Sequence, residues 1–365
     1  MKIAQIAPLY EAVPPKLYGG TEMVVAHLCD ALVELGHDVT LFATAESLTE
    51  ARLIPMRDQA LRLDAVPLKS DLAAHFAMLH DVREMCQQFD VLHFHLDMLH
   101  FPLFEHVAHR SVTTVHSRTD LKDLPAAYAR WPNYGLVSIS DHQRNPLPDA
   151  NWLATVPHGI SPQRYWYTNH PDRGYLAFLG RIAPEKGPDR AIRLARAAGI
   201  PLRIAAKVDG ADQVYFDSVI RPLLDDSLIE FIGEIGAEHK PEFLANALAL
   251  VFPICWPEPF GLVMIEAMAC GTPVIAWDRG SVPEVIEPGR TGFIVNSERE
   301  ALEAVDQVAR LDRREVRAAF ERRFTARHMA ENYLDVYRTL LAAPRTVGRA
   351  RSHAARLTYG TRFGR

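Results

Sequence analysis

Short apolar runs alternate with longer amphipathic segments along the first half of the chain. The runs are typical of buried β-strands, because each is short and ends at polar or turn-forming residues. In order they are KIAQIAP, DVTLFAT, VLHFH, SVTTVH, GLVSIS and WLATVP. Residues Thr21 to Leu35 and Asp71 to Gln88 carry apolar side chains at helical spacing, so we expect helices there. Strands that alternate with helices predict a parallel sheet covered on both faces.

A second set of runs follows a polar, proline-bearing and aromatic stretch from Pro157 to Arg173, which we interpret as a linker. These runs are YLAFLG, PLRIAAK, LIEFIG, LALVFP, TPVIAW and TGFIV. Helical patterns from Glu298 to Leu341 complete the pattern. The sequence therefore predicts two α/β units joined by a hinge, followed by helices.

Length and composition agree with the prediction of two units. A chain of 365 residues exceeds the usual size of a single core, and 48% hydrophobic with 23% charged residues is ordinary for a globular protein. The net charge of -5 gives no overall bias toward nucleic acid or an anionic membrane. The chain has no apolar run of about 18 residues that could span a bilayer, and MKIAQIAPLY lacks a leader pattern. We expect a cytoplasmic protein.

Cysteines and histidines give no metal signature. The four cysteines are scattered without ligand spacing, so we expect packing residues in a reducing compartment. His93 and His95 form an HxH pair that would share one face of a strand, which suggests zinc. No third ligand with suitable spacing accompanies them, so we predict no metal site. His116 also ends a strand, and we expect it to line a binding site.

Cations follow the first strand of the second unit, in FLGRIAPEKGPDRAI. Ligands in open α/β sheets bind beyond the carboxyl ends of the strands, which is where Arg181 and Lys186 fall. Two cations beside the start of a helix suit a diphosphate. The alternative is a solvated basic loop.

Two glutamates stand in the apolar stretch WPEPFGLVMIEAMACGTPVIA. Glu258 lies in a loop after a strand, and Glu266 lies about two turns into a helix that begins at Gly261. Amides at a helix start lack partners within the helix, so those of Phe260, Gly261 and Leu262 can bind an anion. Carboxylates only accept hydrogen bonds, so this pair suits a ligand with hydroxyls on both sides of a phosphate, such as a nucleotide sugar. A helix cap plus a solvated surface residue is the alternative.

Glycines in PKLYGGTEM, Gly19 and Gly20, directly precede the first helix, where a phosphate or sugar could approach closely. Thr21 is the expected N-cap of that helix. No GxGxxG follows the first strand, which argues against a dinucleotide oxidoreductase. In the second unit, Glu284 of RGSVPEVIEPGRTGFIV lies in a helical turn, as a cap or, more weakly, as a ligand contact.

Taken together, these motifs resemble the retaining GT-B glycosyltransferases of family 4, also called glycosyl transferases group 1. GRIAPEKG, EPFGLVMIEAMACGTPVIA with its E-x7-E pair, and VPEVIEPGRTGFIV are similar to the C-terminal domain of that family. YGGTEMVVAHLCDALVELGHDVTLFA resembles the family's start, and VPHGI resembles its linker. The resemblance covers roughly residues 1 to 342.

The resemblance implies an α/β fold of GT-B type, with two Rossmann-like domains whose parallel sheets face each other across a cleft. Residues 1–160 would form the acceptor-side domain and 161–325 the domain that binds the nucleotide-sugar donor. Residues 326–343 would form a helix returning toward the first domain. The basic tail, 344–365, has arginines and no acidic residue, and we expect it to be disordered.

Individual roles also follow from the resemblance. Arg181 and Lys186 would hold the diphosphate, assisted by the amides of Phe260, Gly261 and Leu262. 

Glu258 would meet hydroxyls of the donor sugar, and Glu266 would meet the ribose. Gly20 would lie near the phosphates and His116 near the donor sugar. Arg181, Lys186, Glu258 and His116 are thus the residues expected around the reaction. Lys207, in KVDG, stands where relatives often turn with G-x-G, and either contacts phosphate or forms a salt bridge.

The implied activity is metal-independent, retaining transfer of a sugar from a UDP- or GDP-sugar, without a cofactor. The acceptor is an unidentified small molecule, glycan or lipid hydroxyl, and no nucleic-acid partner is expected. The basic tail leaves a peripheral membrane association open. Two alternatives stand beside this function: a nucleotide-sugar epimerase of the same fold, and a catalytically silent nucleotide-sugar-binding protein.

Overall fold

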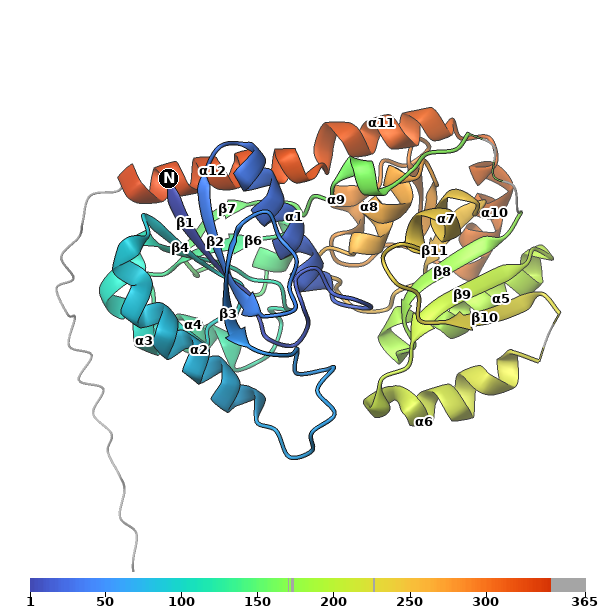
Figure 1. Cartoon of the computed structure of the whole chain (residues 1–365). Coiled ribbons are helices and arrows are strands. Elements are labelled where there is room, and N and C mark those ends of the chain that lie inside the picture. Colours follow the sequence, from blue (N-terminus) through green and yellow to red (C-terminus); the bar gives the residue numbers. More distant parts are fainter. Residues whose placement is uncertain (170, 172–173, 226, 343–365) are drawn as a thin grey trace, which may run out of the picture.

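Two α/β lobes lie side by side in the computed structural model, which describes residues 1–169, 171, 174–225 and 227–342 (Figure 1). The basic tail predicted at 344–365 lies outside the described residues. The alternation of strands and helices predicted from the sequence is confirmed, and each lobe is built on one parallel sheet.

The N-terminal lobe holds seven parallel strands in the order β3-β2-β1-β4-β5-β6-β7. They are β1 (Lys2–Ile6), β2 (Asp38–Thr44), β3 (Arg52–Arg57), β4 (Val91–Phe94), β5 (Ser111–Thr114), β6 (Gly135–Ser138) and β7 (Trp152–Thr155). Its α-helices are α1 (Gly20–Glu34), α2 (Asp71–Met85), α3 (Phe101–Phe104) and α4 (Leu124–Tyr128).

The C-terminal lobe repeats this plan with six parallel strands in the order β10-β9-β8-β11-β12-β13. They are β8 (Leu176–Arg181), β9 (Leu202–Lys207), β10 (Ile229–Gly233), β11 (Ala249–Phe252), β12 (Val274–Trp277) and β13 (Gly292–Val295). The helices of this lobe are α5 (Pro188–Ala198), α6 (Gln213–Tyr215), α7 (Lys240–Ala245), α8 (Leu262–Ala269), α9 (Val282–Val285), α10 (Glu298–Val308) and α11 (Arg313–Arg323). The last helix of the described chain, α12 (Ala326–Ala342), packs on the N-terminal lobe.

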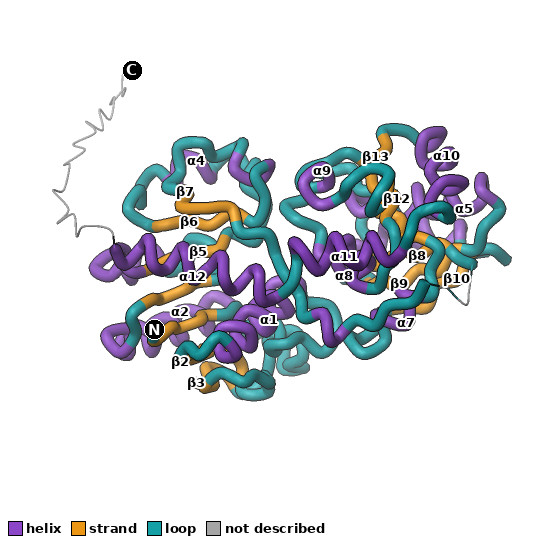
Figure 2. The backbone as a smooth tube through the Cα atoms, turned by 90° about the horizontal axis from the view of Figure 1, so that it is seen from above, coloured by secondary structure: helices purple, strands orange, loops and turns teal. Residues whose placement is uncertain are grey.

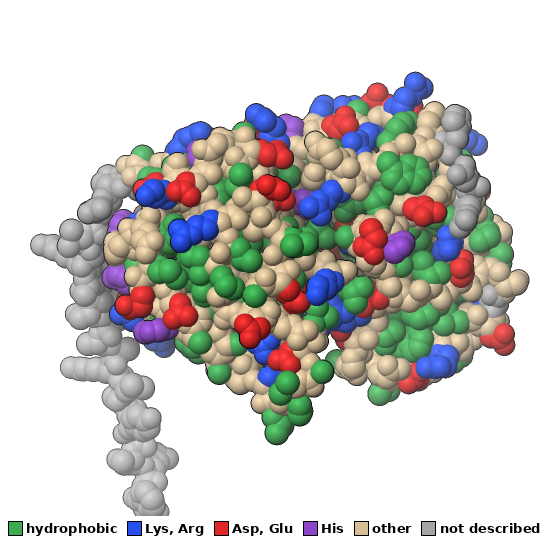
Figure 3. Space-filling model, viewed as in Figure 1, with side chains coloured by type: hydrophobic (Ala, Val, Ile, Leu, Met, Phe, Trp, Pro, Cys, Tyr) green, Lys and Arg blue, Asp and Glu red, His purple; other side chains and the backbone are tan. Residues whose placement is uncertain are grey.

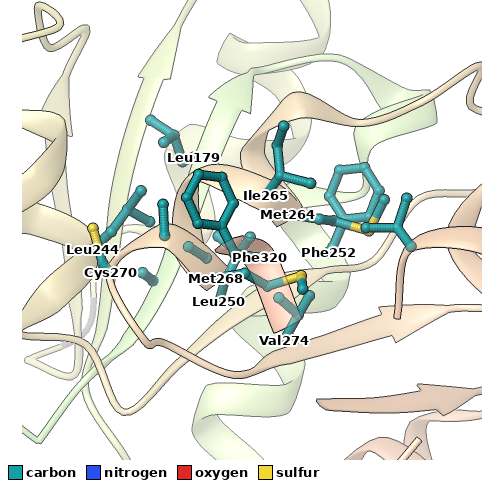
Figure 4. Packing of buried hydrophobic residues seen from close by; sticks show 14 of the residues in the cluster. Leu179, Leu244, Leu250, Phe252, Met264, Ile265, Met268, Cys270, Val274 and Phe320 are labelled. Carbon is teal, nitrogen blue, oxygen red and sulfur yellow. The ribbon is translucent and has the colours of Figure 1, made fainter. Parts of the chain in front are cut away.

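Helix α8 lies in the middle of the C-terminal core, which explains why its sequence is almost wholly apolar. Met264, Ile265 and Met268 are fully buried between the sheet and α11, where Phe320 packs on them (Figure 4). Burying an aliphatic side chain of this size contributes about 1.5–3 kcal/mol. Glu266 is the carboxylate that this apolar helix carries into the interior, where it is 2% exposed.

Helix α1 begins differently from the prediction. Gly19 occupies the N-cap position in an extended conformation and provides no side-chain cap. The prediction that Thr21 caps this helix is therefore wrong, because the helix already begins at Gly20. The buried stripe of α1, with Val24 and Leu28, packs against α12.

The chain crosses between the lobes twice, and the two crossings are hydrogen-bonded to each other. The amide of Ile160 donates to the carbonyl of Phe324 (2.9 Å), and the amide of Ala326 donates to the carbonyl of Ile160 (2.9 Å). After the second crossing α12 runs back over the N-terminal lobe, as seen from above in Figure 2. Its buried Tyr333 and Tyr337 fix it there.

Charges of both signs are mixed on one face of the molecule (Figure 3). On the face in Figure 3, Lys and Arg side chains are interspersed with Asp and Glu. Within the described ranges, no helix combines the length and apolar character that a bilayer crossing requires.

The paired crossings predict a sensitive position at Gly159. A Cβ there would overlap the carbonyl oxygen of Thr325, which is backbone and cannot turn away. We expect Gly159→Ala to lower the free energy of unfolding by about 1–3 kcal/mol, as overpacking does. Urea unfolding measures this. Gly210→Ala is the control, because a Cβ at Gly210 meets no atom within 4 Å. Equal stability of the two variants would contradict the prediction.

Candidate functional site

Both sheets reverse their strand order between two neighbouring strands, β1 and β4 in one lobe and β8 and β11 in the other. Ligands of open α/β sheets bind beyond the carboxyl ends of strands at such a reversal. A cavity of about 360 Å³ lies there, and residues of both lobes line it. Its lining includes all of the predicted site residues except Lys207: Gly19, Gly20, His116, Arg181, Lys186, Glu258, Phe260, Gly261, Leu262 and Glu266.

Two helix N-termini meet at this cavity. A Cβ built on Gly20, at the start of α1, would come 3.6 Å from a methyl group of Leu262, at the start of α8. Helix starts carry partial positive charge and amides without partners in the helix, so both favour an anion. Gly261, just before α8, has a φ of +80°, a conformation in which glycine is favoured.

Lys186 and Glu258 form an ion pair at the wall of the cavity, with Lys186 Nζ 2.5 Å from Glu258 Oε2. The Trp256 indole also donates to Glu258 Oε2 (2.9 Å), and Lys186 Nζ lies 4.8 Å from the centre of the Trp256 ring. From the other lobe, the guanidinium of Arg118 lies 5.4 Å from the same ring. Trp256 thus connects the predicted pair with a cation that the sequence analysis did not single out.

Arg181 is held by three carboxylates. Its guanidinium contacts Glu185 (2.8 Å), Asp212 (3.0 Å) and Asp209 (3.4 Å) through the two terminal nitrogens. Lys207 pairs with Asp209 as well. This matches the salt-bridge alternative for Lys207, whose side chain does not line the cavity, and its phosphate contact stays a prediction.

The two carboxylate oxygens of Glu266 differ in their hydrogen bonds. Oε1 accepts hydrogen bonds from the Tyr165 hydroxyl (2.8 Å) and from Lys240 Nζ (2.9 Å). Among the described residues Oε2 has no partner, although it is buried. A buried carboxylate oxygen without a donor is costly, so this atom is prepared for a hydrogen-bond donor on a ligand in the cavity.

His116 lies at the N-terminal side of the cavity. Its Nε2 is 2.9 Å from His95 Nδ1, and its ring stacks on His158, with ring centres 5.2 Å apart. Burial lowers the pKa of His116 to about 3, so the ring is neutral near pH 7. His158 also lines the cavity, and its buried Nδ1 has no partner within the described chain.

Lining residues that the sequence analysis missed include two cations and a histidine: Arg118, Lys240 and His158. His158 stands in VPHGI, directly after a predicted strand, and this position could have identified it. Lys240 is the first residue of α7, and Arg118 lies in the loop after β5. No sequence pattern marks either position. Glu284 lies elsewhere: its carboxylate accepts from the amides of Asp141 (2.7 Å) and His142 (2.8 Å) in the other lobe.

A second bridge joins the lobes on the other side of the cavity. The carboxylate of Glu234 receives two hydrogen bonds from Arg62 (2.9 and 3.0 Å) and one from the amide of Tyr18 (2.9 Å). Arg62 also contacts Glu11 (2.8 Å) and the carbonyl of Tyr18 (2.8 Å). Glu234 and Arg62 thereby hold the segment that leads to Gly19 and Gly20.

No group of three or more His, Cys, Asp and Glu side chains in the described ranges is arranged to hold a metal ion. The HxH pair His93 and His95, which suggested zinc, is hydrogen-bonded to other protein groups. They are buried in hydrogen bonds to Tyr337, Thr114 and Gln5.

Family comparisons cover both lobes. The family model "Glycosyltransferase Family 4" matches residues 18–164, and "Glycosyl transferases group 1" matches residues 167–325. The alpha-maltose-1-phosphate synthase of Mycolicibacterium smegmatis is 33% identical over 247 residues, which are 57% of this chain and 63% of that protein. The D-inositol 3-phosphate glycosyltransferase of Rhodococcus erythropolis is 36% identical over 193 residues, 46% of this chain and 42% of that protein. The matches thus span less than two thirds of either relative.

Solved structures match nearly the whole chain. AviGT4, a glycosyltransferase involved in avilamycin A biosynthesis, has a TM-score of 0.72 at 26% identity, over 94% of this chain and 98% of its own. The Anabaena protein HepE, solved in complex with UDP and glucose, has a TM-score of 0.72 at 16% identity, over 93% and 100%.

The position of Gly280 predicts how the Glu258 loop is held. Gly280 has a φ of +59°, and a Cβ there would overlap the backbone nitrogen and oxygen of Glu258. We expect Gly280→Ala to displace this loop and to lower the free energy of unfolding by about 1–3 kcal/mol, as overpacking does. Urea unfolding measures this change.

Gly289→Ala is the matched control for this variant. Gly289 also has a positive φ (+75°), but its Cβ would meet nothing within 4 Å. It shares the backbone strain and lacks the overlap, so its free energy of unfolding should fall by clearly less than that of Gly280→Ala. Equal losses in the two variants would count against a specific role of the Gly280 contact.

Proposed function

Because this chain belongs to the group 1 glycosyltransferases with the GT-B fold, we propose that it transfers a sugar from a nucleoside-diphosphate sugar to a hydroxyl acceptor. We further propose that transfer retains the anomeric configuration and uses no metal. The observation that carries the proposal is the cavity between the lobes, in which two helix starts and Lys186 surround a space flanked by Glu258 and Glu266.

The charges of this cavity suit a diphosphate between two hydroxyl-bearing groups. The start of α8 and Lys186 would stabilise negative charge on the leaving diphosphate. Arg181, which Glu185 and Asp212 hold in place, would add a third positive group. Glu258 would accept from hydroxyls of the donor sugar, and the free Oε2 of Glu266 would accept from the ribose. HepE, of the same fold, holds UDP and glucose, so UDP-sugars are the first donors to test.

Fixed cations and helix amides can supply much of the catalysis. As the bond to the diphosphate breaks, charge grows on the phosphate oxygens while the sugar becomes oxocarbenium-like, and preorganised donors stabilise that change. Glu258, the carboxylate nearest to the expected sugar, is bound to Lys186 and Trp256. We therefore favour a front-face route, in which the leaving phosphate takes the proton of the acceptor hydroxyl. The bridges between the lobes would limit water and hydrolysis.

Removal of the two cations tests the assignment. We expect Arg181→Ala and Lys186→Ala each to lower kcat/KM about 100-fold or more, as loss of a charge-stabilising donor does. Arg193→Ala is the control, because Arg193 is also a cation paired with carboxylates, Asp189 and Glu298, but does not line the cavity. Transfer by all three variants at wild-type rates would refute the assignment. Thermal unfolding verifies that each variant is folded.

The role of Glu266 is testable without turnover. Wild-type protein should bind UDP about 10- to 100-fold more tightly than 2′,3′-dideoxy-UDP, since a hydrogen bond to a charged group is lost. In Glu266→Gln, Lys240 and Tyr165 would keep the amide oxygen at the Oε1 position. The amide NH2 would then replace the acceptor Oε2 and could only donate to the ribose hydroxyls, so a neutral hydrogen bond would replace a charged one and the preference for ribose should fall clearly.

Glu258→Gln is the comparison variant for this measurement. It changes a carboxylate in the same cavity, but the one assigned to the sugar, so its preference for UDP over the dideoxy analogue should persist. If Glu266→Gln kept the full preference, the ribose would have to contact another group.

Two assays distinguish the proposed transferase from the two alternative functions. An epimerase of this fold would convert a nucleotide sugar without any acceptor, so chromatography of an acceptor-free reaction identifies it. A catalytically silent binding protein would bind nucleotide sugars in calorimetry and transfer to no member of a broad acceptor panel. Sugar transferred to an acceptor, with the donor sugar otherwise unchanged, supports the proposed transferase.

A further inference from the structure

A continuous chain of buried polar side chains leads from His116 at the cavity to helix α12. Its members come from strands β1, β4 and β5, from the loops that follow two of them, and from α12, and we call it the polar chain. In spatial order they are His116, His95, Gln5, Tyr337, His93, Thr114 and Tyr333. Apart from His116, which is partly exposed at the cavity, these side chains are buried.

Gln5 sets the direction of its neighbours' hydrogen bonds through the orientation of its side-chain amide. Its side-chain amide nitrogen donates to the Tyr337 hydroxyl (3.1 Å), and its carbonyl oxygen lies 2.8 Å from His95 Nε2. A carbonyl oxygen only accepts, so His95 must carry its proton on Nε2.

The histidines of the polar chain are neutral, because burial lowers the pKa values of His93 and His95 well below the ordinary value and that of His116 to about 3. A neutral imidazole has one N–H and one acceptor nitrogen. With the proton of His95 on Nε2, its Nδ1 accepts, and the donor to it is Nε2–H of His116 (2.9 Å). The remaining nitrogen of His116, Nδ1, is then an acceptor.

The hydrogen bonds between Tyr337 and Tyr333 also take one direction once the orientation of Gln5 is given. Tyr337 accepts from Gln5, so its own proton is available to His93 Nδ1 (2.8 Å). His93 Nε2 then donates to Thr114 Oγ1 (2.7 Å), which donates to the Tyr333 hydroxyl (2.7 Å). A turned Gln5 amide would reverse the bonds on both sides and place the proton of His116 on Nδ1.

We propose that Gln5 and Tyr337 are positioning residues that fix the tautomer of His116 through His95, so that His116 offers Nδ1 as a hydrogen-bond acceptor to a sugar hydroxyl of the donor. The tautomer follows from the hydrogen bonds alone. Its consequence for turnover rests on the proposed function, because a hydroxyl that donates to His116 must belong to a bound donor sugar.

The tautomer can be measured directly in the full-length protein. Long-range ¹H–¹⁵N correlation spectra of protein labelled with ¹⁵N-histidine distinguish the two neutral forms, and a His116→Asn variant assigns the signals of His116. We expect His116 to be protonated at Nε2 and not at Nδ1. A wild-type signal protonated at Nδ1, or an even mixture of both forms, would overturn the proposal.

Two tyrosines of α12 provide a matched pair of variants. Tyr337 and Tyr333 lie one turn apart, are 0% and 1% exposed, and each lose one hydroxyl on substitution by Phe. Tyr337→Phe removes the acceptor that orients Gln5, so we expect a second tautomer of His116 to appear. Tyr333→Phe removes only the last bond, beyond His93 and Thr114, and should leave the His116 signals unchanged.

Kinetics add a second measurement. A lost or misdirected hydrogen bond corresponds to about a threefold to tenfold decrease in kcat, and we expect this for Tyr337→Phe and Gln5→Met. Gln5→Met removes the acceptor for His95 altogether, and it tests the same link if Tyr337→Phe fails to fold. Wild-type tautomers in both variants, with thermal unfolding showing that both fold, would refute the role of Gln5. An absence of glycosyl transfer in the wild type would instead refute the proposed function and leave the tautomer measurement intact.

Discussion

The hydrogen bonds between the two crossings of the chain are the constraint on which the site depends. Ile160 pairs with Phe324 and Ala326, so the linker that leaves the first lobe and the segment that returns to it are one backbone ladder. This ladder sets where the second sheet stands relative to the first. Since residues of both lobes line the cavity, its shape depends on this relative placement.

Within that cavity, the buried carboxylates are paired with cations, and one carboxylate oxygen, Oε2 of Glu266, is left without a donor among the described residues. Lys186 neutralises Glu258, and Lys240 with Tyr165 saturates one oxygen of Glu266. Ionised groups in a low-dielectric interior require such partners. The apolar helix α8 can therefore carry Glu266 without disrupting the core, and the positive ends of two helices provide the complementary field for an anion.

Much of this arrangement could be predicted from sequence, because local patterns determine it. Strand runs followed by helices fixed the two parallel sheets, and glycine with charge after a strand located Arg181, Lys186 and Glu258. The predicted N-cap of α1, Thr21, lies two residues beyond the observed one, Gly19, since a glycine without a side-chain cap leaves no signal. Arg118 was missed because its place beside Trp256 depends on how the lobes meet, and Lys240 was missed because its partner Glu266 lies in a different segment of the same lobe. Asp209 and Asp212, two of the three carboxylates that hold Arg181, likewise come from a separate segment, which spacing along the chain does not reveal.

The bridges made by Glu234 and Glu284 bear on the timing of a catalytic cycle. Both join the lobes through bonds between protein groups, an ion pair to Arg62 and hydrogen bonds to backbone amides. A substrate that comes in and a product that leaves would have to wait until these bonds break. In many enzymes with closing domains such an opening sets the turnover number, and the chemical step does not. Arg62, Glu234 and Glu284, none of which lines the cavity, would then control the turnover rate.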